Sequence, residues 1–190
     1  SLTTAWAMTL LAALTFVGAA AMLGPWPLRL SGPCLLLVFG YSLVKRFSAA
    51  AHLVVGLALS LGPGGAWIAI TGTFEDAAIP VSLMIAVGSW VAGFDVLYSL
   101  LDERFDRSRG LHSIPAKFGT KGAVIISALL HLLTVAALAA AHTVAHLGPA
   151  HLVGAAIVTV LRAYEHWLVG PGKLERLERA LLSVHGWVSL

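Results

Sequence analysis

Long apolar runs alternate with short polar segments along almost the whole chain. The runs cover about residues 5–23, 30–44, 49–70, 77–101, 122–142 and 147–169, and another begins after residue 181. An α-helix needs about 20 mostly apolar residues to cross about 30 Å of hydrocarbon. The pattern therefore predicts an all-α protein, a polytopic membrane helical bundle with about six full transmembrane helices and part of a seventh.

Two of the predicted spans are irregular. The run 30–44 is short, so we expect it to cross a thin region of the bilayer or to use Arg29 as a snorkelling end. The sequence Gly-Pro-Gly-Gly at residues 62–65 interrupts the run 49–70. A proline inside a helix removes a hydrogen bond and clashes with the preceding turn, so we expect the third helix to kink or break there.

The composition agrees with a membrane protein and excludes an ordinary soluble domain. Of the 190 residues, 58% are hydrophobic and 11% are charged, whereas a soluble domain carries about 25% charged residues. The mean hydropathy is +0.89. Cys34 is the single cysteine, which excludes a disulfide framework. We expect residues 1–190 to form one transmembrane domain whose surroundings are the lipid bilayer, with no nucleic acid as a partner.

Basic residues lie on alternate connections between the apolar runs. Ten of the twelve Lys and Arg residues occupy these connections: Lys45, Arg46, Arg104, Arg107, Arg109, Lys117, Lys121, Lys173, Arg176 and Arg179. Such an excess marks the cytoplasmic side of a membrane protein. We therefore expect an integral protein of a bacterial inner membrane with Ser1 on the cytoplasmic side. Residues 173–182 read KLERLERALL, which predicts a short helix on the membrane surface.

The strongest chemical signal is a series of acids at the end of the fourth run. On a continuous helix at about 100° per residue, Asp95, Asp102 and Asp106 fall within about 40° of one another, and Tyr98 flanks them. One free charge at the bilayer centre costs at least ~2.5 kcal/mol, and three carboxylates on one face would also repel one another. A cation between them relieves both costs. Oxygen ligands combined with substrate phosphates favour Mg²⁺.

These residues also carry a family resemblance. Residues 94–119, FDVLYSLLDERFDRSRGLHSIPAKFG, resemble the second aspartate-rich motif of the UbiA-type membrane prenyltransferases. Within that superfamily they are most similar to 4-hydroxybenzoate polyprenyltransferases and related enzymes of menaquinone synthesis. Residues 41–47, YSLVKRF, resemble the family's Tyr-Pro-x-x-Lys-Arg segment, with Ser42 where proline is usual. The resemblance covers almost the whole chain.

One part of the family pattern is missing. The family has a first motif, Asn-Asp-x2-Asp-x3-Asp, after its second helix, and no segment of this chain fits it. We therefore expect a piece of the family domain, the C-terminal two thirds, truncated at both ends. Such a piece would hold half of the metal site and be inactive alone.

The resemblance implies a Mg²⁺-dependent aromatic prenyltransferase of ubiquinone or menaquinone synthesis. Its substrates would be a polyprenyl diphosphate and an aromatic acid such as 4-hydroxybenzoate. The resemblance implies that Asp102 and Asp106 bind the metal. It implies a catalytic role for Asp95, Tyr98 and Lys45. The residues implied to bind the diphosphate are Lys45, Arg46, Arg109 and Lys117. The sequence does not decide between Asp95 and Tyr98 for the deeper catalytic role.

Two other functions compete with this interpretation. A superfamily member with a naphthoate, homogentisate, haem or chlorin acceptor would carry the same motif. An ion-coupled transporter would also have acids and a broken helix within the membrane. The sequence leaves open the acceptor, the prenyl chain length and the oligomeric state.

Two smaller expectations concern polar residues outside the motif. Arg162, Glu165 and His166 lie at positions i, i+3 and i+4 of the run 147–169. We expect them to pair with one another, the alternative being that they line the acceptor pocket. Ser113 precedes Ile-Pro and is expected to cap or turn the basic connection.

Overall fold

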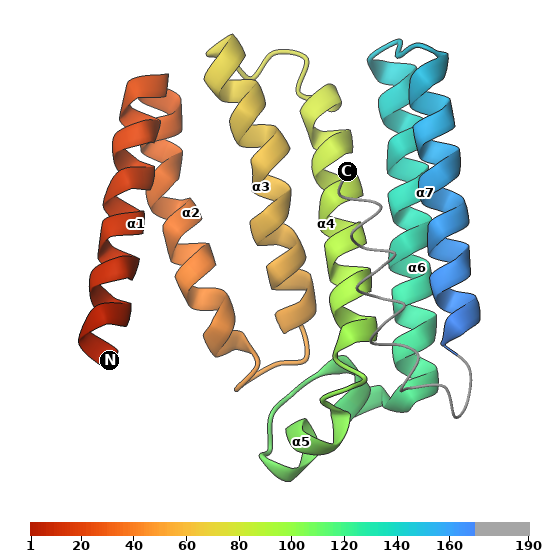
Figure 1. Cartoon of the computed structure of the whole chain (residues 1–190). Helices are drawn as coiled ribbons and strands as arrows, with labels where there is room; N and C mark the ends of the chain where they lie inside the picture. The colour runs from red at the N-terminus through yellow and green to blue at the C-terminus, as the bar shows by residue number, and fades with distance from the viewer. Residues whose placement is uncertain (170–190) are drawn as a thin grey trace.

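The computed structural model describes residues 1–169, which are helical and contain no β-strand. The helices are α1 (Leu2–Leu23), α2 (Pro25–Val44), α3 (Ala51–Thr71), α4 (Ala78–Tyr98), α5 (Glu103–Ser108), α6 (Ile114–Val144) and α7 (Pro149–Leu168). The long helices stand side by side in chain order, and the short α5 lies beneath α4 (Figure 1). We call that end of the bundle the α5 end.

Each long helix packs on the next one in the chain, and α4 makes the most extensive contacts, with α3 and α6. Five helices, α1, α2, α3, α4 and α6, are long and apolar enough to cross a membrane. The helix α7 has 20 residues but carries polar residues near its end. The all-α membrane bundle predicted from hydropathy is therefore confirmed. The last predicted span and the surface helix at 173–182 lie outside the described residues.

The sequence suggested a short second helix, but the helix in the structure has full length. It begins at Pro25 and has 20 residues, the usual length of a span. Pro25 stands in the first turn, where its missing N–H costs the helix nothing. Arg29 lies within α2 with its guanidinium 5.2 Å from the ring centre of Trp26. The hydropathy pattern missed the first turn because prolines and a charge lower its apolar character.

The third helix is not broken at Gly62–Gly65. It runs from Ala51 to Thr71 with Pro63 inside it. On its α4-facing side, Gly56 lies against the backbone of Gly88, so a Cβ at residue 56 would overlap the Gly88 carbonyl. This close approach fixes α3 against the middle of α4.

The acidic series does not lie on one continuous helix. The helix α4 ends at Tyr98, and the amides of Leu100, Leu101 and Asp102 each donate to the carbonyl three residues earlier, in place of the α-helical four. The buried side chains of Leu97 and Leu100 hold this tightened segment in the core. The chain therefore turns before α5, and Asp102 and Asp106 point in directions that a straight helix would not give them.

Candidate active site

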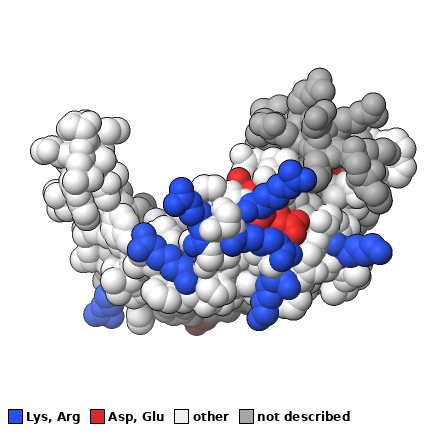
Figure 2. Space-filling view, turned by 90° about the horizontal axis from the view of Figure 1, so that it is seen from below, with Lys and Arg blue, Asp and Glu red and all other residues white. Residues whose placement is uncertain are grey.

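Charged residues gather at the α5 end of the bundle. Lys and Arg side chains surround a smaller group of acids in the view from that end (Figure 2). The ends of α2 and α4, the helix α5 and the start of α6 meet here (Figure 1). The best-packed apolar cluster of the described residues, which includes Val96, Leu97 and Ile114, lies beside them. The charged groups therefore stand on a rigid base.

Asp106 is buried at the centre of this end. Its exposed fraction is 0%, and its Oδ2 lies 3.0 Å from the ammonium of Lys45, which follows the last turn of α2. Asp106 Oδ1 is buried without a hydrogen-bond partner among residues 1–169. A buried carboxylate is costly unless it is paired, and Lys45 supplies the opposite charge that pairs with Asp106.

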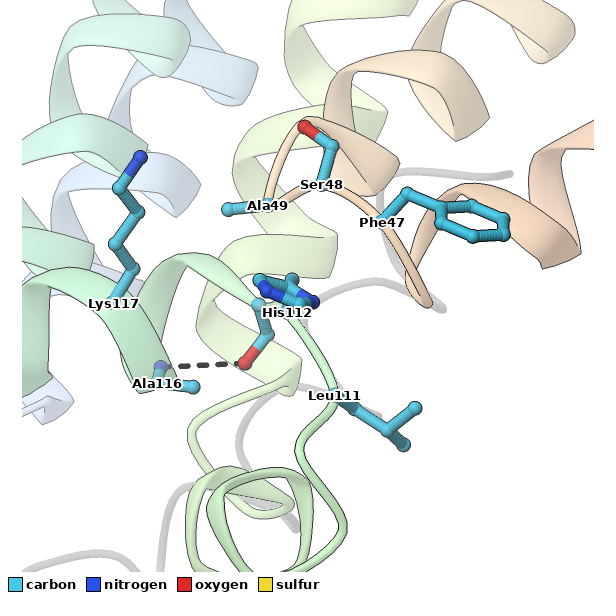
Figure 3. Close-up of a pocket in the computed structure, with 8 residues that line it drawn as sticks. Phe47, Ser48, Ala49, Leu111, His112, Ala116 and Lys117 are labelled. Carbon is cyan, nitrogen blue, oxygen red and sulfur yellow. Dashed lines mark hydrogen bonds between the residues drawn. The ribbon is translucent and has the colours of Figure 1, made fainter.

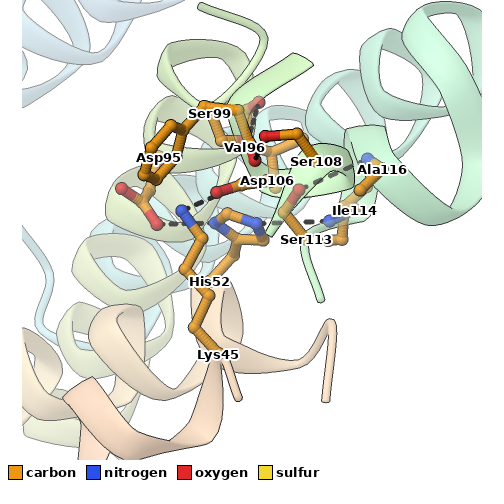
Figure 4. A network of polar contacts seen from close by, with 11 residues as sticks. Lys45, His52, Asp95, Val96, Ser99, Asp106, Ser108, Ser113, Ile114 and Ala116 are labelled. Carbon is orange, nitrogen blue, oxygen red and sulfur yellow. Dashed lines mark hydrogen bonds and ion pairs between the residues drawn. The ribbon is translucent and has the colours of Figure 1, made fainter. Parts of the chain in front are cut away.

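Asp95 is held by a histidine that the sequence analysis did not identify. His52, at the start of α3, is buried, and its Nδ1 lies 2.6 Å from Asp95 Oδ2. The Asp95 side chain is 39% exposed. Figure 4 shows the Lys45 ammonium and the His52 ring pointing toward Asp106 and Asp95. Three helices and α5 thus bring two acids and two basic side chains together.

The connection between α5 and α6, residues 109–113, is tied to the same groups. The amide of Leu111 donates to the Asp106 carbonyl (2.9 Å), and the amide of His112 donates to the Lys45 carbonyl (2.8 Å). The amide of Ile114, the first residue of α6, donates to His52 Nε2 (3.3 Å). We call residues 109–113 the connecting strap. Its backbone is fixed by the residues that form the site.

An open pocket of about 320 Å³ lies between this strap and the α2–α3 connection. Its lining includes Phe47, His112, Ser113 and Lys117 (Figure 3). Ser113 is the N-cap of α6 and accepts a hydrogen bond from the amide of Ala116 (3.3 Å), which confirms the predicted cap. The pocket combines an imidazole and an ammonium with apolar walls.

The other predicted diphosphate residues are exposed cations at the same end. Arg46 directly follows Lys45 and is exposed. The guanidinium of Arg109 lies 5.7 Å from the ring centre of Phe105, and the ammonium of Lys117 lies 5.3 Å from that of Phe118. These three side chains make no ion pair with an acid among the described residues.

The two predicted metal ligands fit a Mg²⁺ ion by their chemistry. Asp102 is exposed, and the amide of Asp106 donates to its carbonyl (2.8 Å). The unpartnered Oδ1 of Asp106 is a hard oxygen without a proton donor among the described residues. Residues 1–169 include no group of three or more His, Cys, Asp or Glu residues that could hold a metal ion. Because Mg²⁺ usually takes one or two carboxylates and completes its shell with phosphate and water, two carboxylates suffice.

Tyr98 and Arg107 each contact a residue of their own helix. Tyr98 stacks on Phe94 with ring centres 6.1 Å apart and is 39% exposed. Arg107 pairs with Glu103 of its own helix (3.0 Å), whereas Asp106 pairs with Lys45 and not with an arginine.

The polar cluster of α7 is separate and paired only in part. Arg162 and Glu165 are buried and form an ion pair of 2.6 Å, which confirms the expected pairing for these two residues. The third member, His166, contacts His131 of α6, with 3.0 Å between Nε2 and Nδ1.

Comparison with known proteins supports one family. The sequence model of the UbiA prenyltransferase family matches residues 1–187. A 4-hydroxybenzoate octaprenyltransferase of Alkalilimnicola ehrlichii is 28% identical over 96% of this chain and 61% of its own length. A protein with the same description from Pseudomonas fluorescens is 32% identical over 82% of this chain and 51% of its own length.

Two further similar proteins come from other organisms. A polyprenyl transferase of a Nectria species is 33% identical over 53% of this chain and 33% of its own length. The solved apo structure of a UbiA homologue from Aeropyrum pernix K1 superposes with a TM-score of 0.87 and 32% identity, covering 97% of this chain and 69% of that one. The chain thus spans about half to two thirds of the length of the bacterial relatives and of the solved structure.

Proposed function

This chain belongs to the UbiA prenyltransferase family, and from that premise we propose that the protein containing it transfers a polyprenyl group to an aromatic acid. The donor is a polyprenyl diphosphate, and the acceptor resembles 4-hydroxybenzoate. The observation that carries the proposal is the buried Asp106, which pairs with Lys45 and keeps one oxygen without a partner among residues 1–169, near Asp95 and at an end rich in cations. The descriptions of the bacterial relatives support the choice of acceptor. The product belongs to quinone synthesis.

The reaction breaks the bond between the allylic carbon and the diphosphate oxygen. The electron pair leaves with pyrophosphate, the prenyl carbon bonds to a ring carbon of the acceptor, and that ring carbon then loses its proton. Negative charge therefore grows on the diphosphate and positive charge on the prenyl group. Lys45, Arg46, Arg109 and Lys117 supply the positive charge that holds the diphosphate.

Two acids have a different task from the cations. Asp102 and Asp106 would hold Mg²⁺, which, when bound, supplies positive charge that stabilises the leaving pyrophosphate. Asp95 stands deeper along α4, where its carboxylate can stabilise positive charge on the prenyl carbon, and Tyr98 lies one turn further on. Opposite charges at the two ends of the breaking bond are what this reaction requires.

The proposal is tested with the full-length gene product in lipid nanodiscs. Geranyl diphosphate is offered with a panel of aromatic acids, with and without Mg²⁺. We expect a prenylated acid in the presence of Mg²⁺, and Asp102→Ala and Asp106→Ala should each remove most of the transfer while the protein remains folded. Glu75→Ala, at the opposite end of the bundle, is the matched control and should be neutral.

The outcomes separate the alternatives. Prenylation of a naphthoate or homogentisate in place of 4-hydroxybenzoate would keep the reaction and change the acceptor. Near-normal turnover in both aspartate variants would overturn the metal assignment. Lys45→Ala should mainly raise the KM for the diphosphate, and an unchanged KM would return Lys45 to a purely structural role. Ion uptake into vesicles without any prenylated product would favour the transporter.

The α5 end is proposed to face the cytoplasm of a bacterial cell. The concentration of Lys and Arg there is the supporting observation. Single cysteines at Ser108 and at Glu75, in a Cys34→Ser background, would be treated in intact spheroplasts with a membrane-impermeant maleimide. We expect labelling at residue 75 and protection at residue 108. The reverse pattern would invert the topology.

A further inference from the structure

The imidazole of His52 is fully engaged between two partners. Its Nδ1 lies 2.6 Å from Asp95 Oδ2, and its Nε2 accepts the amide hydrogen of Ile114 at 3.3 Å. The side chain is 3% exposed. Because a backbone amide can only donate, Nε2 must carry a lone pair, and the ring hydrogen resides on Nδ1. The His52 ring therefore donates from Nδ1 to the Asp95 carboxylate.

This arrangement leaves Asp95 restrained but still accessible. One carboxylate oxygen accepts a short, charge-assisted hydrogen bond, while the side chain keeps 39% of its surface exposed. The hydrogen bond selects one rotamer of Asp95 and so fixes the direction of the free oxygen. A small displacement of a group aligned with a reacting centre can cost about 10²-fold in rate.

The same ring holds the connecting strap. The amides of Leu111 and His112 reach the carbonyls of Asp106 and Lys45, and the amide of Ile114 reaches His52. Two residues of the strap and Ile114, the residue that follows it, thus attach the chain to three parts of the site. Of these three attachments, only that of His52 is made through a side chain, so it is the one that a substitution can remove.

We infer that His52 is a positioning residue of the prenyl-transfer site: it orients the Asp95 carboxylate and anchors the connecting strap to α3. This inference rests on the proposed function, because it assigns the orientation of Asp95 a role in the reaction. It distinguishes His52 from the diphosphate-binding cations. Loss of His52 should impair the chemical step more than the binding of the donor.

The test compares three variants of the full-length protein in nanodiscs. His52→Leu removes both contacts at a similar volume. His52→Gln carries an amide that donates through nitrogen and accepts through oxygen, so it can replace both contacts. Ser60→Ala is the matched control, because Ser60 is equally buried on α3 but bonds only to its own helix, at Leu57 (2.7 Å). Prenyl transfer and amide hydrogen exchange of residues 111–116 are measured for each.

We expect His52→Leu to lower kcat at least tenfold, to change the diphosphate KM by less than twofold, and to speed exchange at residue 114 at least tenfold. His52→Gln should restore most of the kcat and of the protection, and Ser60→Ala should resemble the wild type. If His52→Leu cannot be recovered folded, His52→Met, which also lacks both hydrogen-bonding groups, replaces it with the same expectations.

The outcomes separate this inference from the proposed function. An active wild type together with a His52→Leu kcat within twofold of it would overturn the positioning role alone. The same holds if His52→Leu and His52→Gln lose activity equally or if KM rises in step with the loss of kcat. A wild type without prenyl transfer would overturn the proposed function and, with it, the catalytic part of this inference.

Discussion

The ion pair between Lys45 and Asp106 allows a quantitative test of the site. Lys45→Met removes the charge and keeps most of the aliphatic stem, which leaves the Asp106 carboxylate buried and unpaired. Breaking a fully buried pair costs about 3–5 kcal/mol, and a fully exposed pair contributes about 0–1 kcal/mol. The Asp106 side chain is 1% exposed, and the Lys45 side chain is 31% exposed. An intermediate value of about 2 kcal/mol for the destabilisation by Lys45→Met follows from these limits.

The measurement is a double-mutant cycle on the free energy of unfolding. Lys45→Met, Asp106→Asn and the double variant are unfolded reversibly with sodium dodecyl sulfate in mixed micelles, in metal-free buffer without diphosphate. We expect a coupling energy of about 1–3 kcal/mol, as found for residues in direct contact. The double variant should therefore be more stable than the sum of the single losses predicts.

An exposed ion pair of the same end provides the control. Arg107 and Glu103 lie 3.0 Å apart, but their side chains are 53% and 23% exposed. The same cycle at this pair should give about 0.3–0.5 kcal/mol. If the Lys45–Asp106 coupling were no larger than that of the control pair, Asp106 would have another counter-charge or none, and the arrangement of the site proposed above would be wrong.

Further predictions concern stability and are measured by the same unfolding assay. Ser113→Ala removes the N-cap of α6 and should cost about 1 kcal/mol, and an unchanged stability would show that the cap contributes nothing. Gly56→Val should cost about 1–3 kcal/mol, because α3 and α4 are too close there to admit a larger side chain. Gly65 faces open space, so Gly65→Ala should be neutral or slightly stabilising. Equal effects of the two substitutions would refute the close packing. Arg162→Met should cost about 3–5 kcal/mol and the double variant with Glu165→Leu much less, since the pair is buried; additive losses would contradict mutual pairing.

The bundle was predictable from the sequence because the bilayer leaves few choices. A run of about 20 apolar residues in lipid must satisfy its own backbone, and the α-helix does so within one segment. The five apolar spans followed from this rule. The start of α6 was equally local, since Ser113 followed by Ile-Pro carries its own cap and a proline in the first turn.

The break after Tyr98 was not predictable in the same way. Residues 99–102 contain neither glycine nor proline, and Leu100 and Leu101 extend the apolar run of α4. The turn arises because Leu97 and Leu100 are both drawn into the core beside α6. This is a tertiary effect, and hydropathy along the chain contains no signal for it.

The partners of the acids were also beyond the sequence. The pattern required a positive charge for Asp106 but offered several basic residues, and Lys45 lies on a different helix. His52 gave a weaker signal, as a single ionisable residue in the apolar run 49–70. A buried imidazole needs hydrogen-bond partners, so that histidine could have been flagged, although Asp95 could not have been named as its partner.

The break in the acidic series is what makes a site out of these residues. A straight helix would place three like charges on one stripe, where only an ion could separate them. In the folded chain each buried or half-buried acid has its own basic partner, Lys45 for Asp106 and His52 for Asp95. Asp106 is thereby stable without a metal while keeping one oxygen unpartnered among the described residues. Because α2 and α3 supply these partners, the distance between the two acids depends on helix packing. Substitutions that force α3 and α4 apart, such as Gly56→Val, should therefore alter prenyl transfer even where they touch no acid.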